Sequence, residues 1–273
     1  MTGPAQPLRE QRLVFGEVAH LYDRQRPSYP ARVIDAILSF AGLEGDTATP
    51  VAEVGAGTGK ASVLFAGRGL ALTCLEPSPA MAALARHNLA PFPNAVVQET
   101  SFEDWKPANA YGLVVAAQSW HWVAPEVRYA QAERALVPEG TLAVFWNVMI
   151  GRGDEQLQLD LKAAYGELIQ ARWAMAQAER AEANNWVAEE IEACGLFAPG
   201  SPTIVREPWQ RSYDTEAWIE LLSTQSDHRM LDEDTRARLF ERVGATVDAN
   251  GGKVDVDYVT VAYVARTLGR YNP

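Results

Sequence analysis

The chain has few cysteines, and the two that are present do not form a recognisable metal or disulfide pattern. Cys74 falls in an apolar run, and Cys194 lies far along the chain near the end of a predicted helix. This separation offers neither the short spacing of a zinc site nor a disulfide framework. We therefore interpret both cysteines as small core residues.

Basic residues are also in deficit, with 24 Lys and Arg against 35 Asp and Glu, a formal net charge of -11 and a pI near 4.9. Binding to phosphate backbones depends on clustered Lys and Arg, so we expect no nucleic-acid partner. No stretch approaches the roughly 18 apolar residues of a membrane span, and residues 1–7 lack a charged start followed by an apolar run. These absences predict a cytoplasmic protein without a membrane partner.

What the sequence does contain is enough apolar material for a large core, since 48% of its 273 residues are hydrophobic. In the first half, short apolar runs alternate with helical patterns, which is typical of a doubly wound α/β fold with a mostly parallel sheet. The five predicted strands are residues 51–54, 70–75, 94–98, 113–117 and 141–146, with a turn at 138–140 before the last of them.

The remaining segments predict a helical cap and two further strands. Leu13, Val14, Val18 and Leu21 have roughly helical spacing, and prolines then predict an extended passage before a helix at 31–42. The later predicted elements are a long amphipathic helix at 154–182, a helix at 186–196 closed by Gly195, a strand at 203–209 ended or edged by Pro208, helices that begin at Asp214 and Asp232, and a last strand at 254–265.

The most informative stretch is a strand end followed by closely spaced glycines. Glu53 precedes Gly55, Gly57 and Gly59, and residues 60–66 then predict a helix. Glycine allows a tight turn and a close approach to a ligand, and the start of a helix offers unpaired N–H groups. The third glycine comes one residue earlier than in the dinucleotide-binding pattern G-x-G-x-x-G.

This motif, E-V-G-A-G-T-G, resembles the first motif of the class I S-adenosylmethionine (SAM) dependent methyltransferases. Two further segments resemble a subgroup that includes the trans-aconitate-type small-molecule methyltransferases: Y-D-x-x-R-P-x-Y-P at 22–30 and an A-x-x-x-H-W loop at 117–122. The resemblance implies a Rossmann-like seven-stranded sheet whose last strand is antiparallel and inserted between the fifth and sixth. It also implies SAM as cofactor and a small-molecule acceptor, methylated by direct in-line displacement.

The same resemblance suggests one methyltransferase domain over residues 1–273. Within it we expect an N-terminal lid at 1–30, a SAM-binding core at 31–150, a helical cap with strand insertions at 151–252 and the last core strand at 253–266. The sequence gives no prediction of the oligomeric state, of the acceptor or of its reacting atom.

The expected cofactor site combines position in the sheet with the family's pattern. Glu76 ends the second strand, where a carboxylate can accept the ribose hydroxyls, although a solvated carboxylate at a helix start is the alternative. The resemblance implies that Glu53 positions the amino group, that lid residues touch the cofactor and that Ser101 replaces the commoner aspartate beside the adenine. The full predicted cofactor set is Tyr22, Arg26, Glu53, Gly55, Ala56, Gly57, Gly59, Glu76, Pro77, Met81, Ser101, Phe102 and Gln118.

The expected acceptor site follows the fourth strand, because ligands of open α/β sheets bind beyond the carboxyl ends of the strands. His121 is the candidate catalytic residue: it could act as a general base, as a hydrogen-bonding ligand of the acceptor or as a structural histidine. The predicted substrate pocket consists of His121 and the tryptophans Trp120, Trp122, Trp146 and Trp209, each of which could instead pack in the core.

Two other functions use the same crevice. One is a nicotinamide-dependent oxidoreductase, which the early third glycine and Glu53 disfavour. The other is a regulator that binds SAM or a nucleotide without turnover. The intact glycine loop and the enclosed aromatic crevice favour an enzyme over such a regulator.

Overall fold

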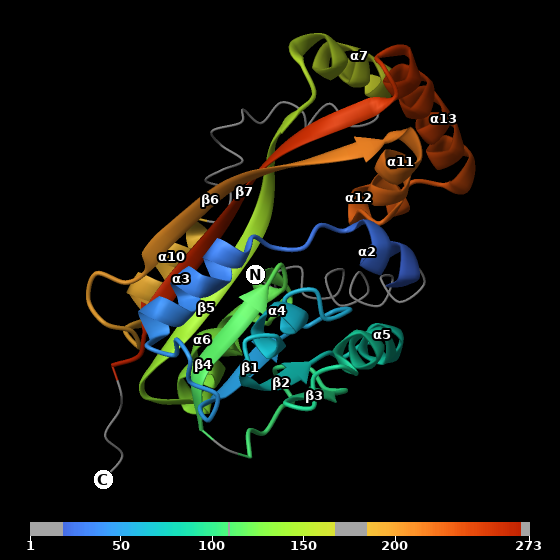
Figure 1. Cartoon of the computed structure of the whole chain (residues 1–273). Coiled ribbons are helices and arrows are strands. Elements are labelled where there is room, and N and C mark those ends of the chain that lie inside the picture. Colours follow the sequence, from blue (N-terminus) through green and yellow to red (C-terminus); the bar gives the residue numbers. More distant parts are fainter. Residues whose placement is uncertain (1–18, 109, 167–184, 269–273) are drawn as a thin grey trace.

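A seven-stranded sheet forms the centre of the molecule in the computed structural model, which describes residues 19–108, 110–166 and 185–268 (Figure 1). The strands follow the order β3-β2-β1-β4-β5-β7-β6, in which β7 is antiparallel to both of its neighbours. This is the topology that the resemblance predicts. The strands are β1 (Pro50–Val54), β2 (Ala71–Leu75), β3 (Ala95–Gln98), β4 (Tyr111–Ala117), β5 (Leu136–Arg152), β6 (Thr203–Asp214) and β7 (Lys253–Arg266).

Helices cover both faces of the sheet and also pack on its long upper extension (Figure 1). Several begin at the residues that the sequence indicates. Ser78, Asp214 and Asp232 each accept a backbone N–H as N-cap residues, and Gly42 and Gly195 end helices with left-handed backbone. The helices are α2 (Ala19–Gln25), α3 (Ala31–Ala41), α4 (Ser62–Ala66), α5 (Pro79–Leu89), α6 (Pro125–Ala135), α7 (Glu155–Tyr165), α10 (Trp186–Cys194), α11 (Thr215–Ser223), α12 (Ser226–Arg229) and α13 (Glu233–Ala249), with a 3₁₀ turn η2 (Trp120–Trp122).

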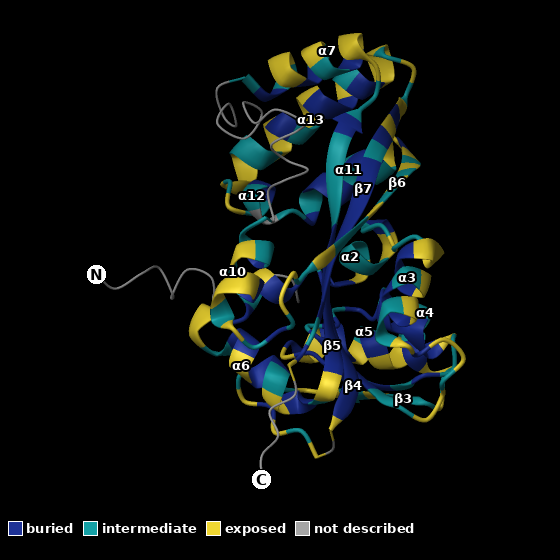
Figure 2. Cartoon of the chain, turned by 90° about the vertical axis from the view of Figure 1, so that its left-hand side faces the viewer, coloured by how far each residue is buried: buried dark blue, intermediate teal, exposed yellow. Residues whose placement is uncertain are grey.

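The alternation of side chains along the strands separates two cores. On β1, Val51 joins the cluster beneath α3 and α4, whereas its neighbour Ala52 joins the cluster beneath α6 and α10. Every residue of β4 is buried, as expected for a central parallel strand covered on both faces. Figure 2 shows this burial as a dark band along β4, β5 and β7.

The three long strands β5, β6 and β7 continue beyond the other strands and carry a third core (Figure 1). Helices α7, α11 and α13 pack against this extension through fully or almost fully buried side chains, among them Leu161, Trp218 and Leu239. These three helices lie within residues 151–252, the predicted cap, whereas α10 of the same range packs on a lower core through Val187 and Ile191.

The start and the length of β5 differ from the prediction. The expected turn at residues 138–140 is an irregularity inside β5, where Glu139 has a φ of 61° and the pairing with β4 shifts between Tyr111 and Leu113. At its other end β5 passes Asn147 and continues to Arg152, because its antiparallel pairing with β7 continues to the pair Arg152 and Val256. The sequence of β5 alone does not reveal this long-range pairing.

Three further boundaries are corrected. Of the two alternatives predicted for Pro208, an end of the strand is wrong, because β6 continues to Asp214. The edge alternative agrees with the structure, since β6 is an edge strand, where a missing N–H is tolerated. Helix α4 begins at Ser62, two residues after the predicted start. Helix α7 ends at Tyr165, and residues 167–182 of the predicted long helix, like Leu13, Val14 and Val18, lie outside the described residues.

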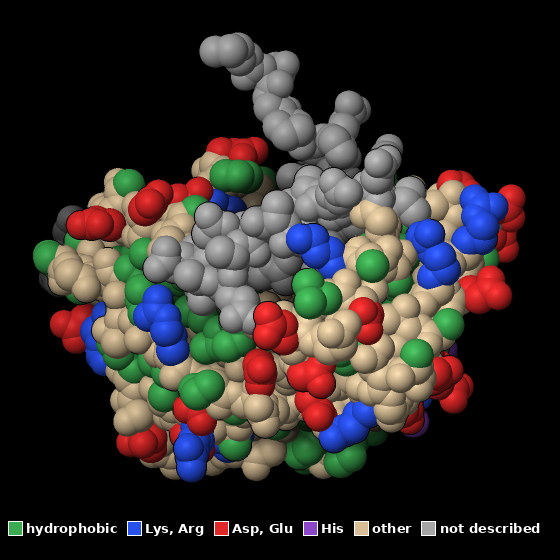
Figure 3. Space-filling model, turned by 90° about the horizontal axis from the view of Figure 1, so that it is seen from above, with side chains coloured by type: hydrophobic (Ala, Val, Ile, Leu, Met, Phe, Trp, Pro, Cys, Tyr) green, Lys and Arg blue, Asp and Glu red, His purple; other side chains and the backbone are tan. Residues whose placement is uncertain are grey.

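None of the described helices combines the length and the apolar character that crossing a bilayer requires. Figure 3 shows acidic, basic and apolar side chains intermixed on the described part of the upper face.

Candidate functional site

The turn between β1 and α4 forms the floor of the site, and its shape depends on glycine. Gly55, Gly57 and Gly59 all have positive φ values, of 65°, 60° and 87°. At Gly55 a Cβ atom would also lie 2.7 Å from Cβ of Ser119, which follows β4. A side chain at Gly55 would therefore meet both an unfavourable backbone conformation and a collision.

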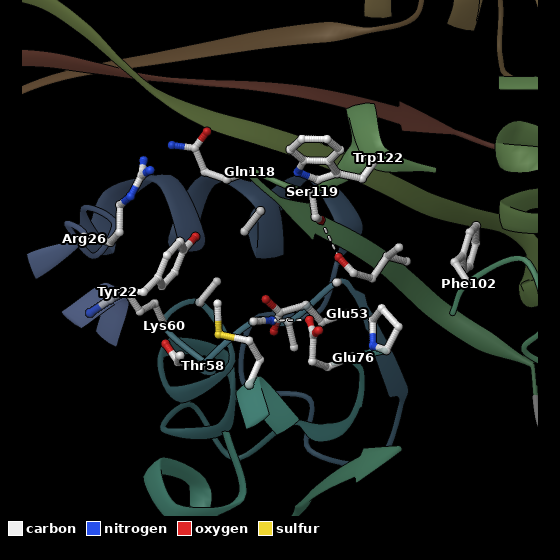
Figure 4. A pocket seen from close by; sticks show the side chains of 18 of the residues that line it. Tyr22, Arg26, Glu53, Thr58, Lys60, Glu76, Phe102, Gln118, Ser119 and Trp122 are labelled. Carbon is white, nitrogen blue, oxygen red and sulfur yellow. Dashed lines mark hydrogen bonds between the residues drawn. The ribbon is translucent and has the colours of Figure 1, made fainter. Parts of the chain in front are cut away.

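Two buried carboxyl groups flank this turn (Figure 4). Glu76, at the end of β2, accepts the backbone N–H groups of Gly57 at 2.9 Å and Ser78 at 2.8 Å. Glu53 is 1% exposed and accepts a hydrogen bond from the hydroxyl of Ser62. Burial raises the pKa of Glu53 to about 8, the hydrogen bond from Ser62 opposes this shift, and the nearby charge of Glu76 adds to it.

Both carboxyl groups face one cavity of about 260 Å³ at the carboxyl ends of β1, β2 and β4. Most of the predicted site residues meet here. Those that line the cavity are Tyr22, Arg26, Glu53, Gly55, Ala56, Gly57, Glu76, Pro77, Met81, Ser101, Phe102, Gln118, His121 and Trp122.

The N-terminal segment covers one side of this cavity. Tyr22 and Arg26 line it, and the Arg26 guanidinium lies 5.3 Å from the centroid of the Tyr22 ring. Burial raises the pKa of the Tyr22 hydroxyl. Arg26 is also bound to the upper part of the molecule. Its guanidinium donates to the hydroxyl and to the carbonyl oxygen of Thr224, both at 2.9 Å, and Thr224 directly follows α11.

Helix α2 is fixed to the core as well as to the upper part. Lys60, which follows the third glycine, donates to the carbonyl oxygen of Asp23, and Asn88 of α5 donates to the carboxylate of Asp23 at 3.0 Å. On the other side Arg24 forms an ion pair with Glu220 of α11. The segment therefore bridges the glycine turn and the upper helices.

The loop after β4 supplies the opposite wall. Gln118 has a left-handed φ of 59°, unusual for a residue other than glycine, and such strain is typical of functional sites. Its backbone N–H donates to the carbonyl oxygen of Phe145 at 2.9 Å, and its side-chain amide donates to that of Asn147 at 3.2 Å. The unusual backbone is thus held by β5.

His121 lies at the exposed end of this loop with Trp122 on one side and Trp146 on the other. The indole N–H of Trp146 donates to Nδ1 of His121 at 3.2 Å. Of the expected substrate-pocket residues, only His121 and Trp122 line the cavity.

The other three tryptophans correct that expectation. Trp120 is fully buried and packs against Phe102 and Tyr129 in the core. Trp146 is buried and reaches the site only through His121, and Trp209 stacks on Tyr258 with ring centroids 4.5 Å apart. Their apolar bulk fills the sheet faces instead of a ligand cavity.

Two predicted cofactor residues have specific local roles. Gly59 lies outside the cavity lining, and its Cα instead faces α5, where an added Cβ would meet Ala85 at 3.6 Å. Ser101 lines the cavity, and its hydroxyl donates to the carboxylate of Asp104 at 2.7 Å. The serine at this position is therefore paired within its own turn.

Several lining residues were missed by the sequence analysis. Tyr29 lies within the segment at 22–30, and Lys60 directly follows the glycine motif. Both could therefore have been found from motifs that the sequence contains. Ser119 donates to the carbonyl oxygen of Val54 and so joins the two central strands, a contact that no local pattern reveals. Burial lowers the pKa of the Lys60 ammonium and raises that of the Tyr29 hydroxyl. Among the described residues, no cluster of His, Cys, Asp and Glu suits a metal ion.

Comparison with known proteins supports a methyltransferase domain in this part of the chain. A family model described as a methyltransferase domain matches residues 52–144, which run from β1 into β5 and contain both carboxyl groups. This segment is therefore similar to a methyltransferase domain, and the relatives below are named as methyltransferases.

Among curated proteins, an uncharacterized methyltransferase of Mycobacterium tuberculosis is 35% identical over 144 residues, covering 51% of this chain and 54% of the relative. A malonyl-[acyl-carrier protein] O-methyltransferase of Geobacter sulfurreducens is 30% identical over 161 residues, 58% of each chain. The chain thus spans little more than half the length of these relatives. The structure of a proposed type II methyltransferase from Anaeromyxobacter dehalogenans has the same fold, with a TM-score of 0.60, 18% identity, and coverage of 90% of this chain and 99% of that one.

Proposed function

We propose that the chain is a SAM-dependent methyltransferase that transfers a methyl group to a small-molecule acceptor by direct in-line displacement. One observation carries the proposal: Glu53, the glycine turn and Glu76 converge on a single cavity, and the turn is joined to Glu76 by the Gly57 N–H. This arrangement combines acceptors for a cationic amino group and for ribose hydroxyls with a backbone that a ligand can approach closely.

In this proposal each residue binds or orients and none forms a covalent intermediate. SAM supplies an activated methyl group on its sulfonium when bound. Glu53 would hold the amino group, Glu76 the ribose hydroxyls, and Met81 and Phe102 the faces of the adenine. Tyr22 and Arg26 would cover the methionine end and exclude water, which leaves alignment of donor and acceptor as the main contribution of the protein.

The finer predictions belong to the same proposal. These are one methyltransferase domain, a cytoplasmic location, the absence of a nucleic-acid partner and kinship with the trans-aconitate-type subgroup. The net charge of -11 supports the absence of a nucleic-acid partner, and the Geobacter relative acts on a carrier-bound malonyl group, so a small acid bound to a carrier is a second candidate acceptor.

Calorimetric titration with SAM and with S-adenosylhomocysteine tests the cofactor, and titration with NADH tests the oxidoreductase alternative. We expect both adenosyl compounds to bind and NADH not to bind. Incubation with SAM labelled in its methyl group and a small-molecule extract then separates an enzyme from a regulator. Binding without any labelled product would favour the regulator, and failure to bind either adenosyl compound would overturn the proposal.

A further inference from the structure

The passage between α2 and α3 is attached to the sheet as well as to α11. Residues 26–30 join the two helices and pass beside β5 (Figure 1). At this point the side-chain amide of Asn147 donates to the carbonyl oxygen of Ser28 at 3.0 Å. Pro27 and Tyr29, the two neighbours of Ser28 in the chain, both line the cavity. The contact therefore holds one wall of the cavity against β5.

The same end of β5 supports the opposite wall. The backbone carbonyl oxygen of Asn147 accepts the side-chain amide of Gln118 at 3.2 Å, and Gln118 is the cavity residue with a φ of 59°. The ring of Tyr29 packs edge-on against Phe145, with ring centroids 4.9 Å apart, and the carbonyl oxygen of Phe145 accepts the backbone N–H of Gln118. Two walls from distant parts of the sequence thus meet on one short piece of β5.

A chain of hydrogen bonds reaches Asn147 from the edge of the sheet. Thr260 of β7 pairs directly with Asn147 and is fully buried. Its hydroxyl donates to Oδ1 of Asn147 at 2.6 Å and accepts the indole N–H of Trp209, on β6, at 2.9 Å. Stacking on Tyr258 holds the Trp209 ring. The chain therefore crosses β6, β7 and β5 before it ends on Ser28.

The two ends of this chain fix its direction. The indole N–H of Trp209 can only donate, and the carbonyl oxygen of Ser28 can only accept. The hydroxyl hydrogen of Thr260 therefore points to Asn147, and the NH₂ group of Asn147 faces Ser28. An amide turned by half a rotation would place its oxygen against the Ser28 carbonyl oxygen and lose that hydrogen bond. The neighbouring strands thus select the one amide orientation that can hold the wall.

We propose that Asn147 is a positioning residue for SAM binding, and that Thr260 and Trp209 act through it by fixing the orientation of its amide. This inference rests on the proposed function. Asn147 lies outside the cavity lining and would act through Tyr29 and Gln118. A wall that is already in place does not have to be ordered when the cofactor binds, and such preorganisation raises affinity.

Calorimetry with SAM and with S-adenosylhomocysteine measures the effect of each link. Asn147→Ala removes the bond to Ser28, and we expect the Kd for both compounds to rise about 3- to 10-fold, as for the loss of one hydrogen bond. Thr260→Val keeps the shape of the side chain but removes the hydroxyl, and we expect a rise of about 3-fold. Trp209→Phe keeps a ring beside Tyr258 and removes the donor, so its effect should not exceed that of Thr260→Val.

Two comparisons distinguish this role from a loss of packing. Thr260→Ser retains the hydroxyl but loses the methyl group, so its Kd for SAM should stay within about 2-fold of the unsubstituted chain. If packing were the cause, this variant would bind as weakly as Thr260→Val. In the Asn147→Ala background, Thr260→Val should change the Kd by less than about 2-fold, because the hydroxyl has no amide left to orient.

Thr141→Val is the matched control for Thr260→Val. Thr141 lies on β5, is 1% exposed, and its hydroxyl has no hydrogen-bond partner among the described residues. The side chain is therefore a buried strand threonine outside the chain of hydrogen bonds. The Thr141→Val variant should bind SAM with an unchanged Kd; a rise equal to that of Thr260→Val would overturn the specific role of Thr260.

The position of Tyr29 in the ligand-free protein gives an independent measurement. Nuclear Overhauser contacts between the rings of Tyr29 and Phe145 should weaken in Asn147→Ala and Thr260→Val and persist in Thr260→Ser. If the unsubstituted chain binds SAM and both weakened variants bind it equally well, the inference is overturned and the methyltransferase proposal stands. Fully additive losses in the double variant would overturn the action of Thr260 through Asn147. Failure of the unsubstituted chain to bind either compound would overturn both proposals.

Discussion

The carboxyl group of Glu53 has an unusual environment in the ligand-free protein. It is almost completely buried, its main partner is the hydroxyl of Ser62, and its pKa is about 8. At neutral pH the group is therefore mostly protonated. A cation bound beside it would favour the ionised form, so cofactor binding and proton release are linked.

The first prediction concerns this linkage. Because binding a cationic amino group ionises Glu53, we expect about one proton to be released per SAM bound at pH 7 and fewer as the pH rises above 8. Calorimetry in phosphate and in Tris, whose ionisation enthalpies differ, measures this number. Glu53→Gln should bind more weakly and release no proton from this site. Equal proton release in both proteins would show that another group is responsible.

The same group should affect stability in the absence of ligand. Its native pKa is raised, so the unfolded chain loses this proton first and the free energy of unfolding falls as the pH rises from about 4.5 to about 8. The shift corresponds to a few kcal/mol at most. Denaturant unfolding at pH 5 and pH 8.5 should show a smaller pH-dependent loss in Glu53→Gln; an unchanged loss would contradict the assigned pKa.

A second prediction at this scale compares two glycines of the same turn. Gly55→Ala places a Cβ 2.7 Å from Ser119, whereas at Gly57 no atom lies within 4 Å of an added Cβ. Both substitutions impose a positive φ on alanine, at about 1 kcal/mol, but only the first adds a collision of roughly 1–3 kcal/mol. Chemical denaturation of the ligand-free variants measures the difference. Equal destabilisation would mean that the Ser119 contact relaxes freely.

Sequence reasoning worked at residues whose role follows from a short motif and failed at residues whose role depends on packing. The glycine turn and Glu76 were placed correctly in the sheet because strand ends and caps are local signals. The predicted positions were wrong for Trp120, Trp146 and Trp209. The place of a tryptophan in the sequence does not show whether its side chain will face the core or the cavity. The Trp146–His121 contact joins β5 to the 3₁₀ turn η2 and could not be predicted.

At the scale of elements, helix α2 connects parts of the chain that are far apart in sequence. It contacts α5 and the glycine turn on one side and α11 on the other, and Arg26 reaches Thr224 directly. The lid segment was predicted from its resemblance to a family pattern. Its attachment to α11 was not, because these ion pairs and hydrogen bonds join residues almost 200 positions apart.

The third prediction tests this attachment through Thr224. Its hydroxyl accepts from Arg26 while it donates to the carbonyl oxygen of Leu221. Thr224→Val removes the hydroxyl, so we expect the Kd for SAM to rise about 3- to 10-fold, as for the loss of one hydrogen bond. Calorimetry measures the Kd, and hydrogen exchange of residues 19–25 should become faster.

Thr246→Val on α13 is the matched control. Thr246 also donates to a carbonyl oxygen within its own helix, that of Arg242, but lies on a helix that packs mainly on α7 and α11. The Thr246→Val variant should bind SAM with an unchanged Kd. If both variants bind SAM alike, the Arg26–Thr224 contact does not support the cofactor site.

At the scale of the whole molecule, three apolar clusters share one set of strands. β5 and β7 contribute to both lower cores and then, further along, to the core beneath α7, α11 and α13. The strand order was predictable from alternating patterns and the resemblance. The extra length of β5 and β7 could not be predicted, because it depends on pairing between segments about 100 residues apart.

The fourth prediction follows from this sharing. Leu239→Ala in the upper core and Leu72→Ala in a lower core each remove a fully or almost fully buried side chain, at a cost of about 2–5 kcal/mol. We expect one cooperative transition in both variants, followed by circular dichroism and by tryptophan fluorescence. Leu159→Ala, at a 56% exposed site, is the control and should change stability by less than about 0.5 kcal/mol. Two separate transitions, only one of which moves, would show that the upper part folds independently.

The hydrogen-bonded ladder between β5 and β7 runs from Thr141 and Arg266 to Arg152 and Val256, with a register shift only near Met149 and Gly151. A clamshell movement of the upper helices away from the glycine turn would have to bend or break this ladder. An opening that leaves this ladder intact would instead have to release the side-chain contacts that hold Asp23, Arg24 and Arg26.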